Sequence, residues 1–181
     1  MLILESRFKS DTKSSDPVDF IFKNFADKLE FKDGNVFVSE NMVFISYKHG
    51  ETDYVYRLKD LLKQHGFEGY IDYEDDTMPI ETSGETAEKL KEAIKKSKKF
   101  ILIASNAALN SKWCNWELGV ADPQKYIHHL ALLSIKPDNS TYEGEEYLQI
   151  YPTIQVDEQS NYYVNYPDGK KEPLGDWLKN E

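Results

Sequence analysis

The sequence contains a single cysteine, Cys114, in 181 residues. One cysteine excludes an internal disulfide and a zinc site built from cysteines, and it is typical of proteins from a reducing compartment. Long apolar runs are absent as well, because no stretch approaches the ~18 residues that a membrane span requires. The opening residues, MLILESR, are too few and too polar for a signal peptide. These absences predict a cytoplasmic protein with no segment in a membrane.

Positive charge is also scarce, since 22 Lys and Arg stand against 32 Asp and Glu and give a net charge of −10. This excess of acid argues against nucleic acid or an anionic membrane surface as the partner. The pair His128-His129 lacks carboxylates at the spacing of a metal site, so we expect no bound metal. The length predicts one domain, with room for an extension.

What the sequence does contain is an alternation of apolar runs and amphipathic segments. Unbroken apolar runs predict buried strands at 42–45, 100–104 and 130–135, and apolar stripes predict helices at 51–65 and 85–99. This alternation is typical of a parallel sheet covered by helices on both faces. The remaining predicted elements are strands at 69–72, 151–156 and 162–166, the second placed at a sheet edge by its Pro152, and a helix at 174–179.

The first 40 residues have a different pattern. Residues 1–15 are polar and predict no regular structure, whereas the Asp-Pro pair at 16–17 is typical of a helix start. A hairpin is predicted at 31–38. We interpret 1–40 as an extension that packs on a main domain, 41–181, although its apolar stripe could instead form a partner surface.

One segment places a carboxylate beside a large aromatic side chain. After the apolar strand at 100–104 we predict a helix that is capped by Asn110 or Ser111 and that a proline at 123 stops. On this helix Trp113 and Glu117 are four residues apart and share a face. Open α/β sheets bind ligands beyond the carboxyl ends of their strands. The residues alone leave open whether Glu117 contacts a ligand or is a solvated helix residue.

Several short motifs occur along the chain in an order and at a spacing that are informative together. They are Phe44-Ile45-Ser46-Tyr47, His65-Gly66-Phe67 with Tyr70-Ile71-Asp72, Phe100-Ile101-Leu102-Ile103-Ala104-Ser105, Ser111-Lys112-Trp113 and Trp116-Glu117-Leu118. Over residues 41–136 this set resembles the Toll/interleukin-1 receptor (TIR) domain family. The resemblance implies a flavodoxin-like α/β fold, with a central five-stranded parallel sheet and helices on both faces.

The family has two functional branches. Animal receptor and adaptor members are interaction modules, whereas bacterial, plant and axon-degeneration members cleave NAD at the nicotinamide–ribose bond. The enzymatic branch carries a glutamate on the helix after the third strand, where this chain has Glu117, and bacterial enzymes place a tryptophan four residues earlier, as Trp113 is here. The resemblance thus implies an NAD+ glycohydrolase or ADP-ribosyl cyclase with Glu117 as the catalytic residue. NAD is then the substrate, and no cofactor is expected. The alternative is a non-catalytic TIR adaptor.

The resemblance also implies which residues line the pocket. The loop after the first strand carries Ser46, Tyr47, Lys48 and His49, and Lys48 is a candidate for contact with the pyrophosphate. Asp72 begins the family's BB loop, here 73–84. From the residues alone, Lys48 could instead be a plain surface lysine and Asp72 a strand-end cap.

Two tryptophans and the cysteine near Glu117 are each open to more than one interpretation. Trp113 is our candidate for an aromatic wall of the pocket, although a core tryptophan is the alternative. For Trp116 we favour the core. No base is evident beside Cys114, so we interpret it as a buried, inert thiol.

Partners follow from the same resemblance. Stand-alone prokaryotic TIR proteins of this kind serve anti-phage defence, as in Thoeris systems, by making a cyclic ADP-ribose-like signal for a separate effector protein. Self-association through the loop 73–84 is expected, because the BB loop of one TIR protomer packs near the glutamate pocket of the next. Two rivals fit less well. A receiver domain needs acids after the first strand to hold Mg²⁺, and this chain has Ser46 to His49 there. A nucleoside deoxyribosyltransferase matches fewer of the motifs.

Overall fold

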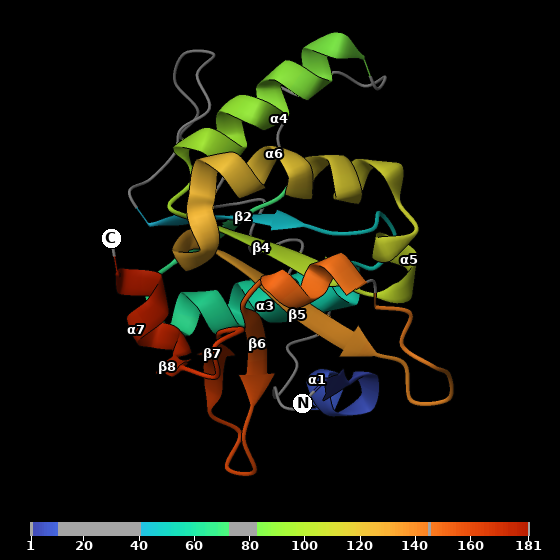
Figure 1. Ribbon diagram of the computed structural model, residues 1–181, viewed down its shortest axis with the longest axis vertical. Coiled ribbons are helices and arrows are strands. Elements are labelled where there is room, and N and C mark those ends of the chain that lie inside the picture. Colours follow the sequence, from blue (N-terminus) through green and yellow to red (C-terminus); the bar gives the residue numbers. More distant parts are fainter. Residues whose placement is uncertain (1, 11–40, 73–82, 145, 181) are drawn as a thin grey trace, which may run out of the picture.

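The computed structural model describes residues 2–10, 41–72, 83–144 and 146–180 (Figure 1). Its strands are β1 Ile3–Leu4, β2 Met42–Ser46, β3 Glu68–Tyr70, β4 Lys99–Ala104, β5 Leu130–Lys136, β6 Thr153–Val156, β7 Tyr162–Asn165 and β8 Lys171–Pro173. Its helices are α1 Glu5–Ser10, α3 Thr52–Gln64, α4 Gly84–Lys96, α5 Asn106–Leu109, α6 Lys112–His129, the 3-10 helix η2 Glu146–Ile150, and α7 Leu174–Lys179. The predicted helix start at 16–17, the predicted hairpin at 31–38 and most of the loop 73–84 lie outside the described residues.

The sheet has the order β3-β2-β4-β5-β6-β7-β8, and β1 pairs with β5 off this path. The strands from β3 to β6 are parallel to their neighbours, which confirms the predicted central five-stranded parallel sheet. β7 and β8 extend it in antiparallel pairing. The edge position predicted for β6 was wrong, because β6 lies between β5 and β7. Pro152 precedes the strand, and its carbonyl accepts a hydrogen bond from the N–H of Leu132 at 2.9 Å, so its missing N–H interrupts nothing.

The central strands are buried on both faces, as their unbroken apolar sequences predict. In β2, Val43 and Ile45 join the core cluster that includes α3 and α7, whereas Phe44 joins the cluster that includes α4 and α6. This division follows from the two-residue period of a strand. Figure 1 shows α4 and α6 together on one side of the sheet. The described residues include no helix long and apolar enough to cross a membrane.

The chain start is ordered from Leu2 to Ser10, so the prediction of no regular structure was wrong there. Ile3 lies opposite Ile135 in the pairing of β1 with β5, and Ile3 and Phe8 are each only 2% exposed. Burial of these two apolar side chains stabilises the packing of an otherwise polar segment on the domain. Residues 2–10 pack on the rest of the described chain, while the extension 1–40 and its boundary stay a prediction.

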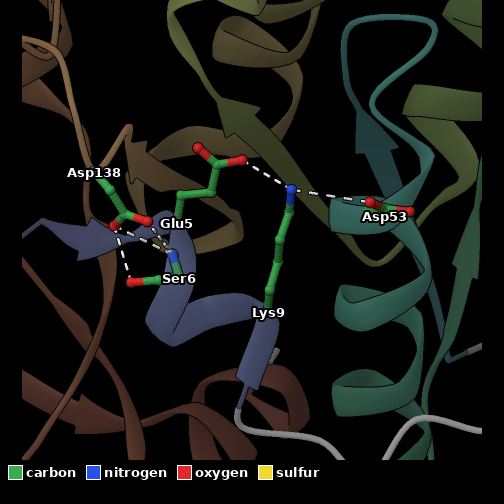
Figure 2. Close-up of polar contacts among 5 residues, drawn as sticks. All are labelled: Glu5, Ser6, Lys9, Asp53 and Asp138. Carbon is green, nitrogen blue, oxygen red and sulfur yellow. Dashed lines mark hydrogen bonds and ion pairs between the residues drawn. The ribbon is translucent and has the colours of Figure 1, made fainter.

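Polar contacts fix α1 on its neighbours (Figure 2). The backbone N–H and hydroxyl of Ser6 both donate to the carboxylate of Asp138, after β5. Lys9 lies 2.8 Å from Glu5 in its own helix and 3.9 Å from Asp53 in the first turn of α3. α1 therefore joins the segment after β5 to the beginning of α3, the helix that follows the loop at 47–50.

The prediction that Pro123 stops its helix was also wrong. α6 continues past Pro123 to a kink at Tyr126, where the backbone leaves helical geometry with φ 52° and ψ 173°, and a short second segment then ends at His129. Proline removes one hydrogen-bond donor from a helix but leaves the later residues able to continue it. Beyond Pro123, the Lys125 ammonium donates to the carbonyls of Lys95, at 3.1 Å, and Ser97. These bonds tie the second half of α6 to the end of α4.

Candidate active site

A pocket of about 130 Å³ opens beyond the carboxyl ends of β2 and β3. Its lining consists of Tyr47, Lys48, His49, Asp72, Thr86, Leu90, Ser111, Trp113, Cys114 and Glu117. Every predicted site residue except Ser46 is in this set. Ser46 is the last residue of β2 and lies behind the pocket, 1% exposed, where its hydroxyl donates to the Glu117 carboxylate. The structure thus brings together residues that are up to 71 positions apart.

Glu117 supplies a carboxyl group at the inner wall. It lies on α6, which Ser111 caps by accepting a hydrogen bond from the N–H of Cys114 at 3.4 Å, so the Ser111 alternative for the cap is confirmed. Its side chain is 7% exposed. Burial raises the pKa of Glu117, the hydrogen bond from Ser46 lowers it and the nearby Asp72 raises it, and together they bring it from 4.5 to about 8. The carboxyl is therefore largely protonated at neutral pH while the pocket is unoccupied.

Trp113 forms the outer wall of the pocket. It is 38% exposed, and its ring meets the ring of Trp116 edge-on, with centroids 5.2 Å apart at 82°. Trp116 is partly buried against the core cluster under α6. Trp116 therefore contributes to packing, as expected, while Trp113 offers an accessible aromatic face one helical turn from Glu117.

The loop after β2 brings two basic side chains to the rim. Lys48 and His49 are exposed, and Nε2 of His49 lies 3.2 Å from Oδ2 of Asp72. Asp72 thus meets a residue of the neighbouring loop rather than acting only as a strand-end cap. Gly50 has φ +99°, a conformation that favours glycine and that lets the loop turn back into α3. The loop presents the positive charge of Lys48 at the rim while the carboxyl of Glu117 lies within.

Cys114 is 2% exposed, and burial raises the pKa of its thiol. The thiol donates to the carbonyl of Tyr47 at 3.3 Å. The predicted burial is confirmed, and a raised pKa favours the less reactive thiol form, while the predicted inertness stays a prediction. Its contact also ties α6 to the loop after β2, which fixes the spacing between Glu117 and that loop.

Four lining residues were not predicted as part of the site. Ser111 was predicted only as a helix cap and Cys114 only as a buried thiol, whereas Thr86 and Leu90 come from α4, which was predicted as a helix with an apolar stripe and no part in the site. The sequence could have shown that Thr86 lies at the start of α4, because it follows Ser83 by three residues and the two side chains form a reciprocal capping box. Leu90 belongs to the apolar stripe of α4 and is 1% exposed. Among the residues that the structure describes, no group of three or more His, Cys, Asp or Glu could hold a metal ion.

The fold and this pocket define a TIR-type α/β domain with a buried glutamate at the carboxyl edge of its sheet. The sequence model of the TIR domain family matches residues 43–163, and the chain belongs to that family.

One curated protein and one solved structure are similar to the chain. The chain is 30% identical over 115 residues to the "Probable 3′ cyclic ADP-D-ribose synthase ThsB′" of Bacillus cereus (strain MSX-D12), a match that covers 62% of this chain and 59% of that protein. The chain thus spans less than two thirds of the length of this relative. Among solved structures it is similar to the TIR domain of the Toll-related receptor TRR-2 from Hydra magnipapillata, with 21% identity and a TM-score of 0.43 over 59% of this chain and 76% of that one.

Proposed function

We propose that this protein cleaves NAD+ at the nicotinamide–ribose bond and closes the ADP-ribosyl group into a cyclic ADP-ribose. The observation that carries the proposal is the position of Glu117, buried in a pocket with Trp113 as its outer wall. The similarity to a relative named as a 3′ cyclic ADP-D-ribose synthase supports the same chemistry.

One carboxylate is enough for this reaction. When the bond between the ribose carbon and the pyridinium nitrogen breaks, both electrons go to the nitrogen and nicotinamide leaves as a neutral molecule. No acid has to protonate the leaving atom, unlike ordinary glycoside hydrolysis with its two carboxyl groups. The barrier arises from positive charge that develops on the ribose, and a carboxylate held at the ribose hydroxyls stabilises that charge. Glu117 is the candidate for this role.

The protonation state of Glu117 fits a cationic substrate. Burial favours the neutral carboxyl in the unoccupied pocket. The pyridinium ring of NAD+ carries a positive charge, and an opposite charge in the same pocket favours the carboxylate form. Substrate binding would therefore promote loss of the Glu117 proton, and the reactive form would arise with NAD+ in place.

The walls of the pocket favour ring closure over hydrolysis. Trp113 and the 6% exposed Tyr47 shield the ribosyl cation from water, which leaves a nucleophile of the same molecule to capture it. Lys48 lines the same pocket, and it remains the candidate for contact with the pyrophosphate, which lies between the two halves of the dinucleotide.

The biological setting proposed is anti-phage defence of the Thoeris kind in the cytoplasm. In that setting the cyclic product is a signal for a separate effector protein. Self-association through the loop 73–84 would regulate the activity by joining one protomer to the pocket of the next in a head-to-tail contact.

The test is incubation of the purified chain with NAD+, followed by mass spectrometry of the products. We expect nicotinamide together with an ADP-ribose species that is lighter by one water. Glu117→Gln keeps the shape of the side chain and should lower turnover ~100-fold or more, the scale for loss of one preorganised electrostatic group. An inert wild-type protein, or a Glu117→Gln variant with unchanged turnover, would contradict the proposal and favour the adaptor alternative.

A further inference from the structure

A second cavity lies on the other side of the sheet. It has a volume of about 490 Å³, within the range of pockets that hold small organic ligands. Its lining consists of Phe8, Arg57, Leu61, Gln64, His65, Ser160, Asn161, Tyr162, Pro173, Leu174, Gly175, Asp176 and Lys179. Among the described residues, none lines both this cavity and the candidate active site.

The cavity combines parts of the TIR match with parts of the chain that flank it. Phe8 lies before residues 43–163, and the wall from Pro173 to Lys179 lies after them. The rest of the lining, from α3, His65 and the segment 160–162, lies within the match. The flanking segments α1 and α7 therefore complete the cavity at one end of α3.

Charge in the cavity runs against the charge of the whole protein. Arg57 on α3 and Lys179 on α7 approach it from two elements, with Asp176 opposing them, in a chain whose net charge is −10. The planar guanidinium of arginine matches the geometry of phosphate and carboxylate groups. His65 adds a ring that lies close to Gly175, where a Cβ would be only 2.7 Å from its Nδ1. These groups favour an anionic ligand.

Part of the remaining wall is apolar and packed, and Gln64, Ser160 and Asn161 add polar side chains to it. Phe8, Leu61 and Leu174 belong to the core cluster of this face and are 2%, 8% and 1% exposed, so they are fixed by packing around them. Tyr162 packs against the same cluster. A pocket with a packed apolar wall and a few polar groups is typical of sites that bind a ring with a charged substituent.

We infer that this cavity is a second ligand site, which binds a small organic phosphate through Arg57 and Lys179 and holds its ring against Phe8 and Leu61. The inference is independent of the proposed function, because it concerns binding at a place that contains none of the pocket residues around Glu117.

Adenosine monophosphate, which joins a phosphate to a flat ring, is a suitable probe. Calorimetric titration of the full chain should show binding that is tighter than that of adenosine or of inorganic phosphate alone. Arg57→Gln should weaken this binding about tenfold, the scale of one hydrogen bond to a charged group. Asp176→Asn removes the opposing charge and should tighten it about twofold.

Two variants locate the bound probe. Lys63→Gln makes the same charge change as Arg57→Gln on the same helix but away from the cavity, and it should leave the affinity unchanged. Trp113→Ala, at the other pocket, should also leave it unchanged. No binding at millimolar probe would overturn the inference. So would an affinity that falls with Trp113→Ala and not with Arg57→Gln, because the probe would then occupy the pocket around Glu117.

Discussion

The hydroxyl of Ser46, at the end of β2, donates a hydrogen bond to the carboxyl group of Glu117 on α6. Both side chains are buried, and the bond opposes the rise in the pKa of Glu117 that burial causes. The sequence analysis placed Ser46 among the residues that contact substrate. The structure places it behind the pocket instead, where it orients the carboxyl group and favours its ionised form.

Removal of this hydroxyl should therefore move the pH dependence of the reaction. If the carboxylate is the active form, kcat/KM rises with pH up to the pKa of free Glu117, about 8, and then levels off. In Ser46→Ala the bond that lowers this pKa is lost, so the midpoint should move to higher pH and kcat/KM at pH 7 should fall. Ser134→Ala is the matched control, because Ser134 is a buried serine of β5 outside the pocket lining. Equal profiles for Ser46→Ala and the control would contradict the role of Ser46.

Glu117 should also lower stability at alkaline pH. Its pKa is about 8 in the folded protein and near 4.5 when exposed, so the folded state holds this proton more tightly. Between these values the unfolded state binds fewer protons, and the stability contributed by the group falls as pH rises. Above pH 8 the loss is complete and reaches a few kcal/mol at most, at about 1.4 kcal/mol per pKa unit.

Glu117→Gln removes this ionisation. Urea unfolding should show the variant more stable than the wild type at pH 8.5 and close to it at pH 4.5. A variant that is less stable than the wild type at both pH values would contradict a raised pKa of Glu117 in the folded protein.

Trp113 should control what happens to the ribosyl cation. Trp113→Ala opens the pocket to water, so the fraction of linear ADP-ribose among the products should rise while the fold is kept, because Trp113 is 38% exposed. Tyr126→Ala is a suitable control, since Tyr126 lies on the same helix, is 71% exposed and is not part of the pocket. Chromatography that shows the same product ratio in all three proteins would exclude a shielding role for Trp113.

The docking of α1 should be worth measurable stability. Phe8 is 2% exposed and its ring centroid lies 6.4 Å from that of Tyr54 on α3, so Phe8→Ala should lower the free energy of unfolding by about 3 kcal/mol or more. Lys9→Ala, which breaks half-exposed ion pairs of the same helix, should change it by less than about 1 kcal/mol. The free energy of unfolding of both variants is measured by urea unfolding. A Phe8→Ala variant as stable as the wild type would contradict the docking of residues 2–10.

Self-association through the loop 73–84 remains a prediction from the sequence. If the head-to-tail contact regulates activity, specific activity should rise with protein concentration. It should fall with added salt, because the lysine-rich helix predicted at 85–99 would attract acidic segments of a neighbouring protomer. Ile80→Asp in the loop should lower the activity and leave the monomer folded. Specific activity that is independent of concentration, with a monomer in light scattering, would contradict this mode of regulation.

The sequence by itself determined the central sheet and the helix that carries the glutamate. An unbroken apolar run such as 100–104 predicts a strand that is buried on both faces, and the apolar stripes of α3 and α4 have a helical period. The alternation of strands and helices can therefore be predicted from local patterns. The cap of α6 at Ser111 was predictable for the same reason, because a cap depends on residues three apart. The two proline predictions failed because Pro152 precedes β6 rather than lying in it, and because α6 continues past Pro123 as far as the kink at Tyr126.

Only the tertiary structure decided the properties of the site. The pKa of Glu117 depends on burial and on Ser46, 71 positions away in the chain, and neither is visible in a local pattern. Thr86 and Leu90 reach the pocket because α4 packs beside α6, and Phe8 helps form the second cavity because β1 pairs with the end of β5. These features rest on contacts between segments distant in sequence. Local propensity sets which elements form, whereas the packing of their faces sets which side chains meet and how much water reaches them.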